Sequence, residues 1–290
     1  HPKIWVNNLE IAPPIWKQPG LAKNTHEIPF IDEDYFYREP TKIDLKKGWN
    51  KVLLKIPHGG TSWKWMFTCV PVNVESDDGV SEAFDLKFDP SLRIYSDYYY
   101  NKKEKFEAEP NTKDEIIFLG NSITDGGKWN ELFPNINAIN RGISGDVTDG
   151  ILARIEEVTA SQPKKLFLLI GTNDLARGKS ADYVAKNSQK IVEAIQKQSP
   201  NTIIYVQSVL PVNPNVGEKF IGHKSKVQKI LELNRKLERM ASEKSVNYIN
   251  IHNPFSDKKG YLKVKLTYDG LHLSEKGYTF WKKRLKKYIK

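Results

Sequence analysis

From residue 114 onward, apolar residues gather in short continuous runs that alternate with longer amphipathic stretches. Such runs are typical of parallel strands that are covered on both faces. The runs span residues 115–119, 136–140, 165–170, 202–210 and 246–251. The amphipathic stretches predict helices over residues 146–160, 180–198, 223–243 and 274–289, with Ser180 and Ser274 as N-caps. This alternation predicts a five-stranded, doubly wound α/β sheet.

The first 94 residues have a different pattern, in which short alternating or β-rich runs are separated by turn residues. The runs read KIWVN, GWNKVLLKIPH, KWMFTCVPVNV and AFDLKFD, and they predict a small antiparallel β-sandwich. Five of the seven tryptophans lie in this part of the chain. They can form the core of the sandwich, which we favour, or a platform on which sugar rings stack. Residues 95–113 are polar, charged and contain Pro110, and they predict a linker to a second domain over residues 114–290.

Composition narrows the class of protein. With 290 residues, 39% of them hydrophobic and 28% charged, the chain has the size and balance of a globular protein of about two domains. No run approaches the roughly 18 apolar residues of a membrane helix, so we expect no membrane span. The single cysteine, Cys69, excludes an internal disulfide and a cysteine-built metal site, and its apolar neighbours favour a buried structural thiol.

The net charge of +10 belongs to the second part of the chain. Residues 1–110 carry 15 Lys and Arg against 17 Asp and Glu, whereas residues 111–290 carry 30 against 18. A basic surface attracts anions, but the densest run, KKRLKKYIK, is typical of the solvated face of a last helix. Because no nucleic-acid-binding motif accompanies the charge, we expect no nucleic-acid partner.

Chemically useful residues follow the predicted strands. Ser122 comes after the first strand, Gly145 lies in the loop after the second, and Asn173 comes after the third. Asp269 and His272 lie beyond the fifth strand, just before the last helix. In doubly wound sheets the ligand site forms at the carboxyl ends of the strands, so we expect these five residues to meet. Together they supply the groups that acyl transfer requires.

Each of these residues has a possible role in that chemistry. Ser122 is the candidate nucleophile, and the His272 imidazole is the candidate base that removes its proton. Asp269 can orient the imidazole through its second ring nitrogen. The backbone N–H groups of Ser122 and Gly145 and the carboxamide of Asn173 can stabilise the oxyanion. Without catalysis, Ser122 would be a helix cap, Gly145 a turn residue and Asn173 a capping or turn residue.

Other histidines compete with His272 for the role of the base. His252 follows the fifth strand directly but has no acidic residue three positions before it, so we favour His272. His223 has Lys224 and Lys226 beside it and is expected at the surface, and Asp174 is expected to be structural.

Four sequence blocks, GNSIT, NRGISGD, GTND and DGLHL, occur in this order over roughly residues 115–285. They resemble the blocks of the SGNH hydrolase superfamily, also called GDSL-type esterases. They are most similar to its platelet-activating-factor acetylhydrolase-like and carbohydrate acetylesterase branches. The resemblance implies a flavodoxin-like three-layer αβα sandwich and a serine esterase that uses no metal or cofactor. The block roles fall on Ser122, Gly145, Asn173 and His272, with Asp269 as the third triad member.

One residue departs from the family pattern. The first block usually has Asp where this chain has Asn121, next to the candidate nucleophile. Because that position lies outside the triad, the difference puts the substrate preference or pH optimum in doubt more than the chemistry.

These observations predict a serine esterase that removes a short acyl group, acetyl above all, from a carbohydrate or related alcohol. A lysophospholipase, a thioesterase or a phospholipid acetylhydrolase would use the same triad. A non-catalytic glycan-binding protein on an esterase scaffold is the alternative from another class. The expected partner is a small-molecule or glycan ester, and the oligomeric state stays open.

The N-terminal part carries a second, shorter resemblance. GWNKVLLKI, followed by an aromatic strand, resembles the end of a galactose-binding-like jelly roll of the kind attached to many secreted glycan-degrading enzymes. The chain begins at His1 without Met or an apolar leader. Both features favour a periplasmic or secreted location.

Overall fold

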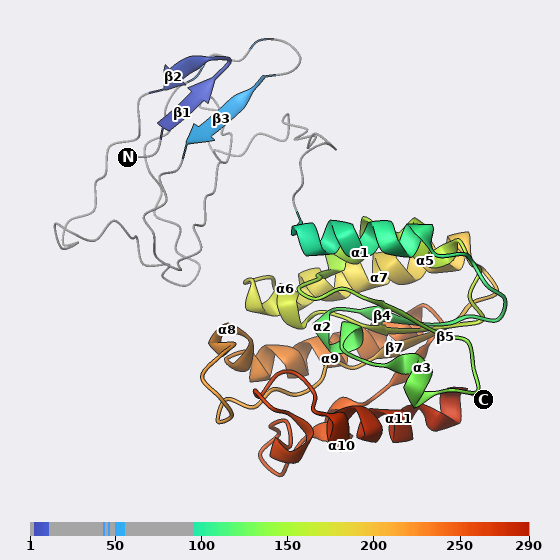
Figure 1. Cartoon of the computed structure of the whole chain (residues 1–290). Coiled ribbons are helices and arrows are strands. Elements are labelled where there is room, and N and C mark those ends of the chain that lie inside the picture. Colours follow the sequence, from blue (N-terminus) through green and yellow to red (C-terminus); the bar gives the residue numbers. More distant parts are fainter. Residues whose placement is uncertain (1–2, 12–42, 44–45, 47–49, 56–94, 290) are drawn as a thin grey trace. The chain divides into compact units, whose positions relative to one another are not determined.

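The chain divides into two compact units, His1–Asp89 and Pro90–Lys290, which are described separately. The computed structural model describes residues 3–11, 43, 46, 50–55 and 95–289 (Figure 1). Cys69 and the strands expected in KWMFTCVPVNV and AFDLKFD lie outside the described residues. The galactose-binding-like resemblance therefore stays a prediction.

The described part of the first unit is an antiparallel sheet with the strand order β2-β1-β3. Its strands are β1 (Lys3–Val6), β2 (Leu9–Ile11) and β3 (Val52–Lys55). Asn7 and Asn8 join β1 to β2 in a two-residue turn, and both have positive φ angles, of 51° and 72°. Asparagine tolerates this left-handed backbone, which matches the twist of a tight hairpin.

The second unit contains a five-stranded parallel sheet with the order β5-β4-β6-β7-β8. Its strands are β4 (Ile116–Gly120), β5 (Ala138–Gly142), β6 (Lys165–Leu169), β7 (Ile203–Gln207) and β8 (Asn247–Ile249). Each lies within or overlaps one of the five apolar runs, so the predicted parallel sheet is confirmed. Gly120 pairs with both Gly142 and Leu169, which brings the carboxyl ends of three strands level at one edge of the sheet.

Helices cover both faces of the sheet, as the three-layer prediction requires (Figure 1). They are α1 (Asp97–Ala108), α2 (Ser122–Asp125), α3 (Trp129–Leu132), α4 (Thr148–Leu152), α5 (Ile155–Thr159), α6 (Thr172–Ala176), α7 (Ala181–Gln198), α8 (Ile221–Lys224), α9 (Val227–Glu243), α10 (His252–Phe255) and α11 (Glu275–Ile289). Successive strand side chains point to opposite faces. In β4, Ile117 and Leu119 join the core beneath α7 and α9, whereas Ile116 and Phe118 join the core with α3, α10 and α11.

An aromatic stack anchors the segment after α2, the helix that begins with the candidate nucleophile Ser122. The ring of Trp129 in α3 lies parallel to that of Phe118, with centroids 3.9 Å apart, and meets Trp281 of α11 edge-on at 4.8 Å. The Trp129 indole N–H donates to the backbone oxygen of Thr124 in α2. Burial of these rings therefore holds α2 against both the sheet and α11.

The segment predicted as a linker, residues 95–113, contains helix α1 and belongs to the second unit. Ser96 caps the helix, and its two buried side chains, Tyr99 and Phe106, are two turns apart. The Tyr99 hydroxyl donates to the backbone oxygen of Gly150 at 2.7 Å. Only two of the twelve residues of α1 are buried, and most of the others are polar or charged. The sequence of this helix therefore resembles that of a linker.

Two predicted helices differ in extent from those observed. The stretch at 146–160 forms the two short helices α4 and α5, which are separated at Arg154, where φ is −129° and ψ is 21°. The stretch at 223–243 begins within α8 and continues as α9 from Val227.

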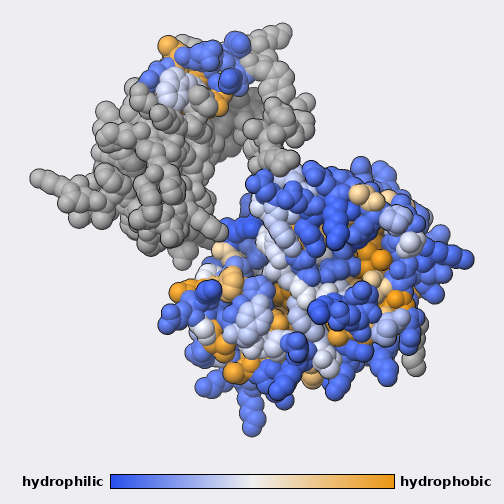
Figure 2. All heavy atoms as spheres, viewed as in Figure 1, coloured by the Kyte–Doolittle hydropathy of each residue, from blue (hydrophilic) through white to orange (hydrophobic). Residues whose placement is uncertain are grey.

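The described surface is largely hydrophilic in the view of Figure 2, with scattered hydrophobic residues. Within the described ranges, no helix is both long enough and apolar enough to cross a membrane.

Candidate active site

The candidate nucleophile lies at the first turn after β4. Ser122 is the first residue of α2, and the N-cap is its neighbour Asn121, whose Oδ1 accepts from the N–H of Ile123 at 3.1 Å. Ser122 is therefore not needed as the cap, and its hydroxyl is available for chemistry. A Cβ at Gly120 would lie 2.3 Å from the backbone oxygen of Leu169, so only glycine fits this close to β6 at the end of β4.

Asn121, the position that departs from the family pattern, has no exposed surface. Its carbonyl oxygen accepts from the N–H groups of Thr124 and Asp125, in addition to the cap that its side chain makes. Its Nδ2 has no hydrogen-bond partner among the described residues. Asn121 thus shapes the turn that carries Ser122, at the cost of one unsatisfied buried donor.

The structure brings the three predicted triad residues into one hydrogen-bonded chain. Ser122 Oγ lies 3.0 Å from His272 Nε2, and His272 Nδ1 lies 2.7 Å from Asp269 Oδ2. Asp269 Oδ1 accepts from the backbone N–H groups of Leu271 and His272. Burial opposes ionisation of Asp269, but the hydrogen bonds from His272 and the two backbone groups outweigh it, so its pKa lies below the usual value. The charged carboxylate is suited to stabilise an imidazolium.

The turn after β5 presents the backbone N–H of Gly145. Gly145 has a φ of +82°, a conformation that glycine adopts without strain. The turn is held on both sides: the N–H of Ser144 donates to Asp125 Oδ2 at 3.1 Å, and Gly145 oxygen accepts from Arg177 at 2.7 Å. Among the described residues, the N–H groups of Gly145 and Ser122 donate no hydrogen bond. Both are therefore available to an oxyanion.

The third candidate oxyanion donor, Asn173, lies in α6 directly after β6. Its Nδ2 donates to the backbone oxygen of Asp146 at 2.8 Å, and its Oδ1 lies 2.9 Å from His223 Nε2. An amide nitrogen carries two hydrogens, so one remains for an oxyanion. The structure thus brings together the predicted site residues, and it adds His223, which we expected at the surface.

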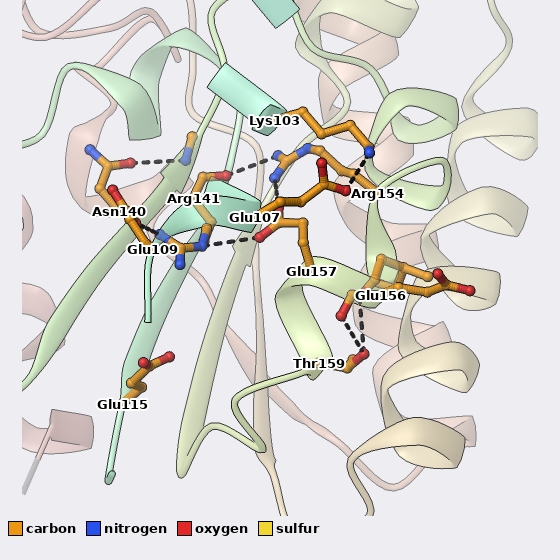
Figure 3. A network of polar contacts seen from close by, with 12 residues as sticks. Lys103, Glu107, Glu109, Glu115, Asn140, Arg141, Arg154, Glu156, Glu157 and Thr159 are labelled. Atoms are coloured by element: carbon orange, nitrogen blue, oxygen red, sulfur yellow. Dashed lines mark hydrogen bonds and ion pairs between the residues drawn. The ribbon is translucent and has the colours of Figure 1, made fainter. Parts of the chain in front are cut away.

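A buried ion-pair network surrounds Asp146, whose backbone oxygen accepts a hydrogen bond from Asn173. Arg154 is completely buried and donates through Nε and Nη2 to Asp146 Oδ2, at 3.1 and 3.0 Å. Figure 3 shows Arg154 and Arg141 reaching the acidic side chains of Glu157 and Glu109, the latter at the C-terminal end of α1. Burial raises the pKa of the Asp146 carboxyl to about 6, although the Arg154 charge opposes this. The network fixes the backbone of Asp146 and so the position of its carbonyl oxygen.

Two aromatic rings lie beside the candidate base. The ring of Tyr268 lies nearly parallel to the His272 ring, with centroids 6.0 Å apart. The ring of Phe220 meets His272 edge-on at 4.9 Å. Tyr268 is 67% exposed and Phe220 is 37% exposed, so both present apolar surface beside the triad.

Residues 213–224 contact the site through Phe220 and His223. Lys224 in this segment is buried, and its ammonium group donates to the backbone oxygens of Val216 and Gly217. The side chain of Asn213 donates to the Leu262 oxygen, and its backbone N–H donates to Gly270 in the triad loop. The sequence pattern did not indicate Phe220 or Tyr268, and it favoured a surface position for His223, because irregular loops show no periodicity and these residues lie outside the recognised blocks.

The competing residues have other partners. His252 is buried in α10, where its Nδ1 lies 3.3 Å from Ser256 Oγ and burial lowers its pKa. Asp174 accepts from the N–H and the hydroxyl of Thr148, which agrees with the structural role expected for it. Over residues 3–11, 50–55 and 95–289, no three His, Cys, Asp or Glu side chains gather into a group that could hold a metal ion.

Comparison with known proteins identifies the family of the chain. Residues 118–280 match the model of the GDSL-like Lipase/Acylhydrolase family. The chain belongs to this family. As a GDSL-like acylhydrolase, it is an ester-hydrolysing enzyme with the fold of this family, and the predicted esterase class is confirmed.

Individual relatives lie within the same family or fold. The chain is 29% identical over 184 residues to human platelet-activating factor acetylhydrolase IB subunit alpha1. The aligned region covers 60% of this chain and 75% of the human protein. It is similar to a solved GDSL-like lipase from Bacteroides thetaiotaomicron, with 26% identity and a TM-score of 0.58 over 66% of this chain and 96% of that one. A solved acetyl xylan esterase shares the fold at 19% identity, with a TM-score of 0.51 over 61% of this chain and all of the other.

Proposed function

We propose that this GDSL-like acylhydrolase removes acetyl groups from oxygen atoms of carbohydrates, with Ser122, His272 and Asp269 as its catalytic triad. The observation that carries the carbohydrate part is the pair of exposed rings, Tyr268 and Phe220, beside His272. The human relative supports the acetyl part, since it is by name an acetylhydrolase.

In the proposed reaction, His272 Nε2 takes the hydroxyl proton of Ser122 while Oγ attacks the carbonyl carbon of the ester. The carbonyl oxygen becomes an oxyanion that accepts hydrogen bonds from Ser122 N–H, Gly145 N–H and Asn173 Nδ2. As the intermediate collapses, His272 gives its proton to the departing alcohol oxygen, which leaves an acetyl-serine. Water then attacks the carbonyl carbon of the acetyl-serine while His272 takes its proton. Collapse of this second intermediate returns the proton to Ser122 Oγ and releases acetate. Asp269 keeps the imidazole in the required tautomer throughout.

This sequence of proton transfers assigns the aromatic rings to the alcohol side of the substrate. His272 must lie beside the alcohol oxygen in order to protonate it, so groups next to His272 lie beside the alcohol and not the acyl group. Tyr268 and Phe220 are those groups. A sugar ring offers a flat C–H face that packs on an aromatic ring.

The proposal is tested by an acetate-release screen against acetylated xylan, pectin fragments, sialic acids and amino sugars, each compared with Ser122→Ala. For the best sugar substrate, Tyr268→Ala should lower kcat/KM about fivefold, because stacking of one ring on an aromatic side chain contributes on the order of 1 kcal/mol. Tyr268→Phe, which keeps the ring, should retain the activity. Hydrolysis of ethyl acetate, which has no ring to stack, should be unaffected by either change.

Equal losses on the sugar ester and on ethyl acetate would overturn the assignment of the rings. The absence of any acetylated carbohydrate that is hydrolysed faster than ethyl acetate would overturn the carbohydrate proposal. A phospholipid acetylhydrolase is the second candidate, favoured by the name of the human relative. A higher kcat/KM on an acetylated phospholipid than on every acetylated sugar would establish that candidate instead.

A further inference from the structure

We propose that His223 is a positioning residue that holds Asn173 in the orientation needed to stabilise the oxyanion. The inference rests on the proposed role of Asn173 in the reaction. His223 Nε2 lies 2.9 Å from Asn173 Oδ1 and comes from a part of the chain 50 residues away. His223 lies outside the sequence blocks that carry the resemblance to the family.

The direction of this hydrogen bond follows from the other partner of Asn173. The backbone oxygen of Asp146 can only accept a hydrogen bond, so the atom of the carboxamide that faces it at 2.8 Å is Nδ2. The atom that faces His223 is therefore Oδ1, which is an acceptor. It follows that His223 Nε2 carries a hydrogen and donates it to Asn173.

These two bonds leave the carboxamide with one free N–H. With Oδ1 tied to His223 and one Nδ2 hydrogen tied to Asp146, rotation of the amide group is blocked and the second Nδ2 hydrogen keeps one direction. A donor on Oδ1 also polarises the amide and strengthens the N–H on the other side. Loss of His223 would remove both effects while leaving the donor atom in place.

The backbone around His223 is built to hold the side chain there. Helix α8 is only four residues long, but the buried Lys224 ties it to the backbone oxygens of Val216 and Gly217, at 2.9 and 2.6 Å. The Phe220 ring meets both imidazoles edge-on, with centroids 5.8 Å from His223 and 4.9 Å from His272. One segment thus contacts the candidate oxyanion donor and the candidate base.

The test compares His223→Gln with His223→Glu in the hydrolysis of p-nitrophenyl acetate. The two side chains have nearly the same size, but Gln can donate to Asn173 Oδ1, whereas an ionised Glu can only accept. We expect His223→Gln to keep kcat within about threefold of the wild type. His223→Glu should lower kcat about 10- to 100-fold, which does not exceed the effect of removing a whole oxyanion donor. KM should change little in either variant, because the bond matters most when the charge develops.

Two further variants separate positioning from a structural effect. Ser225→Ala, at the end of the same helix, should leave kcat unchanged, and all variants should show similar melting temperatures. In an Asn173→Ala background, His223→Glu should cause no further loss of kcat, because the residue on which it acts is gone.

Equal kcat in the Gln and Glu variants would overturn the inference, as would a full loss from His223→Glu in the Asn173→Ala background. If His223→Glu lowers the melting temperature, His223→Met, which cannot donate to Asn173 Oδ1, takes its place in the comparison with His223→Gln in both backgrounds, and the same outcomes are expected. Because p-nitrophenyl acetate contains no sugar, failure to hydrolyse acetylated carbohydrates would overturn the proposed substrate without changing the outcome for His223.

Discussion

The carboxylate of Asp269 holds His272 at two points: Oδ2 lies 2.7 Å from the ring nitrogen Nδ1, and Oδ1 lies 2.7 Å from the backbone nitrogen. One acidic side chain therefore orients both the imidazole and the peptide that carries it. The same arrangement leaves Nε2 facing Ser122.

Replacing Asp269 by Asn should lower kcat by about 10³- to 10⁴-fold, because the amide favours the wrong imidazole tautomer and supplies no charge for the imidazolium. Steady-state hydrolysis of p-nitrophenyl acetate measures the loss. Asp182→Asn, at an exposed position in α7, is the matched control and should be silent. A loss below about tenfold in Asp269→Asn would show that Asp269 is not the triad acid.

Gly145 and Gly178 form a matched pair for the oxyanion donor. Both have left-handed backbones, with φ of +82° and +87°, and an added Cβ would meet no atom closer than 3.8 Å at either position. Alanine should therefore destabilise each variant by a similar amount, about 1–2 kcal/mol in the free energy of unfolding. Only Gly145→Ala should also lower kcat, because strain relief moves the N–H that the oxyanion needs. Equal activity losses in the two variants would argue against this role for Gly145.

Asp125 connects α1 to the turn before Gly145. Its carboxylate accepts from the hydroxyls of Tyr98 and Ser144, from the Ser144 N–H and from the Lys102 ammonium group, at 2.7 to 3.1 Å. Burial opposes ionisation, but the hydrogen bonds from Lys102, Ser144 and Tyr98 outweigh it, so the pKa of Asp125 lies below its usual value. An acid with a lowered pKa stabilises the fold above its unfolded-state pKa of about 4 and loses that contribution as the pH falls through the folded-state pKa.

Asp125→Asn should therefore lower the free energy of unfolding by about 1–3 kcal/mol at pH 7. The difference from the wild type should shrink as the pH approaches 3. Urea denaturation at both pH values measures this, with Glu131→Gln, an exposed residue of α3, as the control. A constant difference between pH 7 and pH 3 would contradict the assigned ionisation.

Arg154 should be among the most sensitive positions for stability. Its replacement by Met leaves the buried carboxylates of Asp146 and Glu157 without their common partner, at a cost of about 3–5 kcal/mol. Arg239→Met breaks an exposed pair with Glu243 one helical turn away and should cost less than about 0.5 kcal/mol. The midpoints of urea denaturation compare the two, and similar midpoints would show that the buried network does not support the fold.

Local patterns predicted the parts of the fold that depend on local physics. Strands β4 and β6 are buried over their full length, so their apolar runs are continuous and easy to recognise. Ser180 caps α7 by accepting from the N–H of Tyr183, as its position before an amphipathic stretch predicts. Helix α1 was missed because its burial depends on two aromatic residues and on a partner, Gly150, some 50 residues further along the chain.

The amino-acid sequence alone therefore determines the alternation of strands and helices. Because strand ends converge in a parallel sheet, it also determines that Ser122, Gly145, Asn173 and the Asp269–His272 pair lie at one edge. It does not reveal that Asn121 caps α2, or that His223 reaches Asn173. Those contacts depend on the path of irregular loops, such as the left-handed backbone of Phe220 before α8. Hydrophobic periodicity does not predict the paths of loops, because loop paths depend on packing between segments that are distant in the chain.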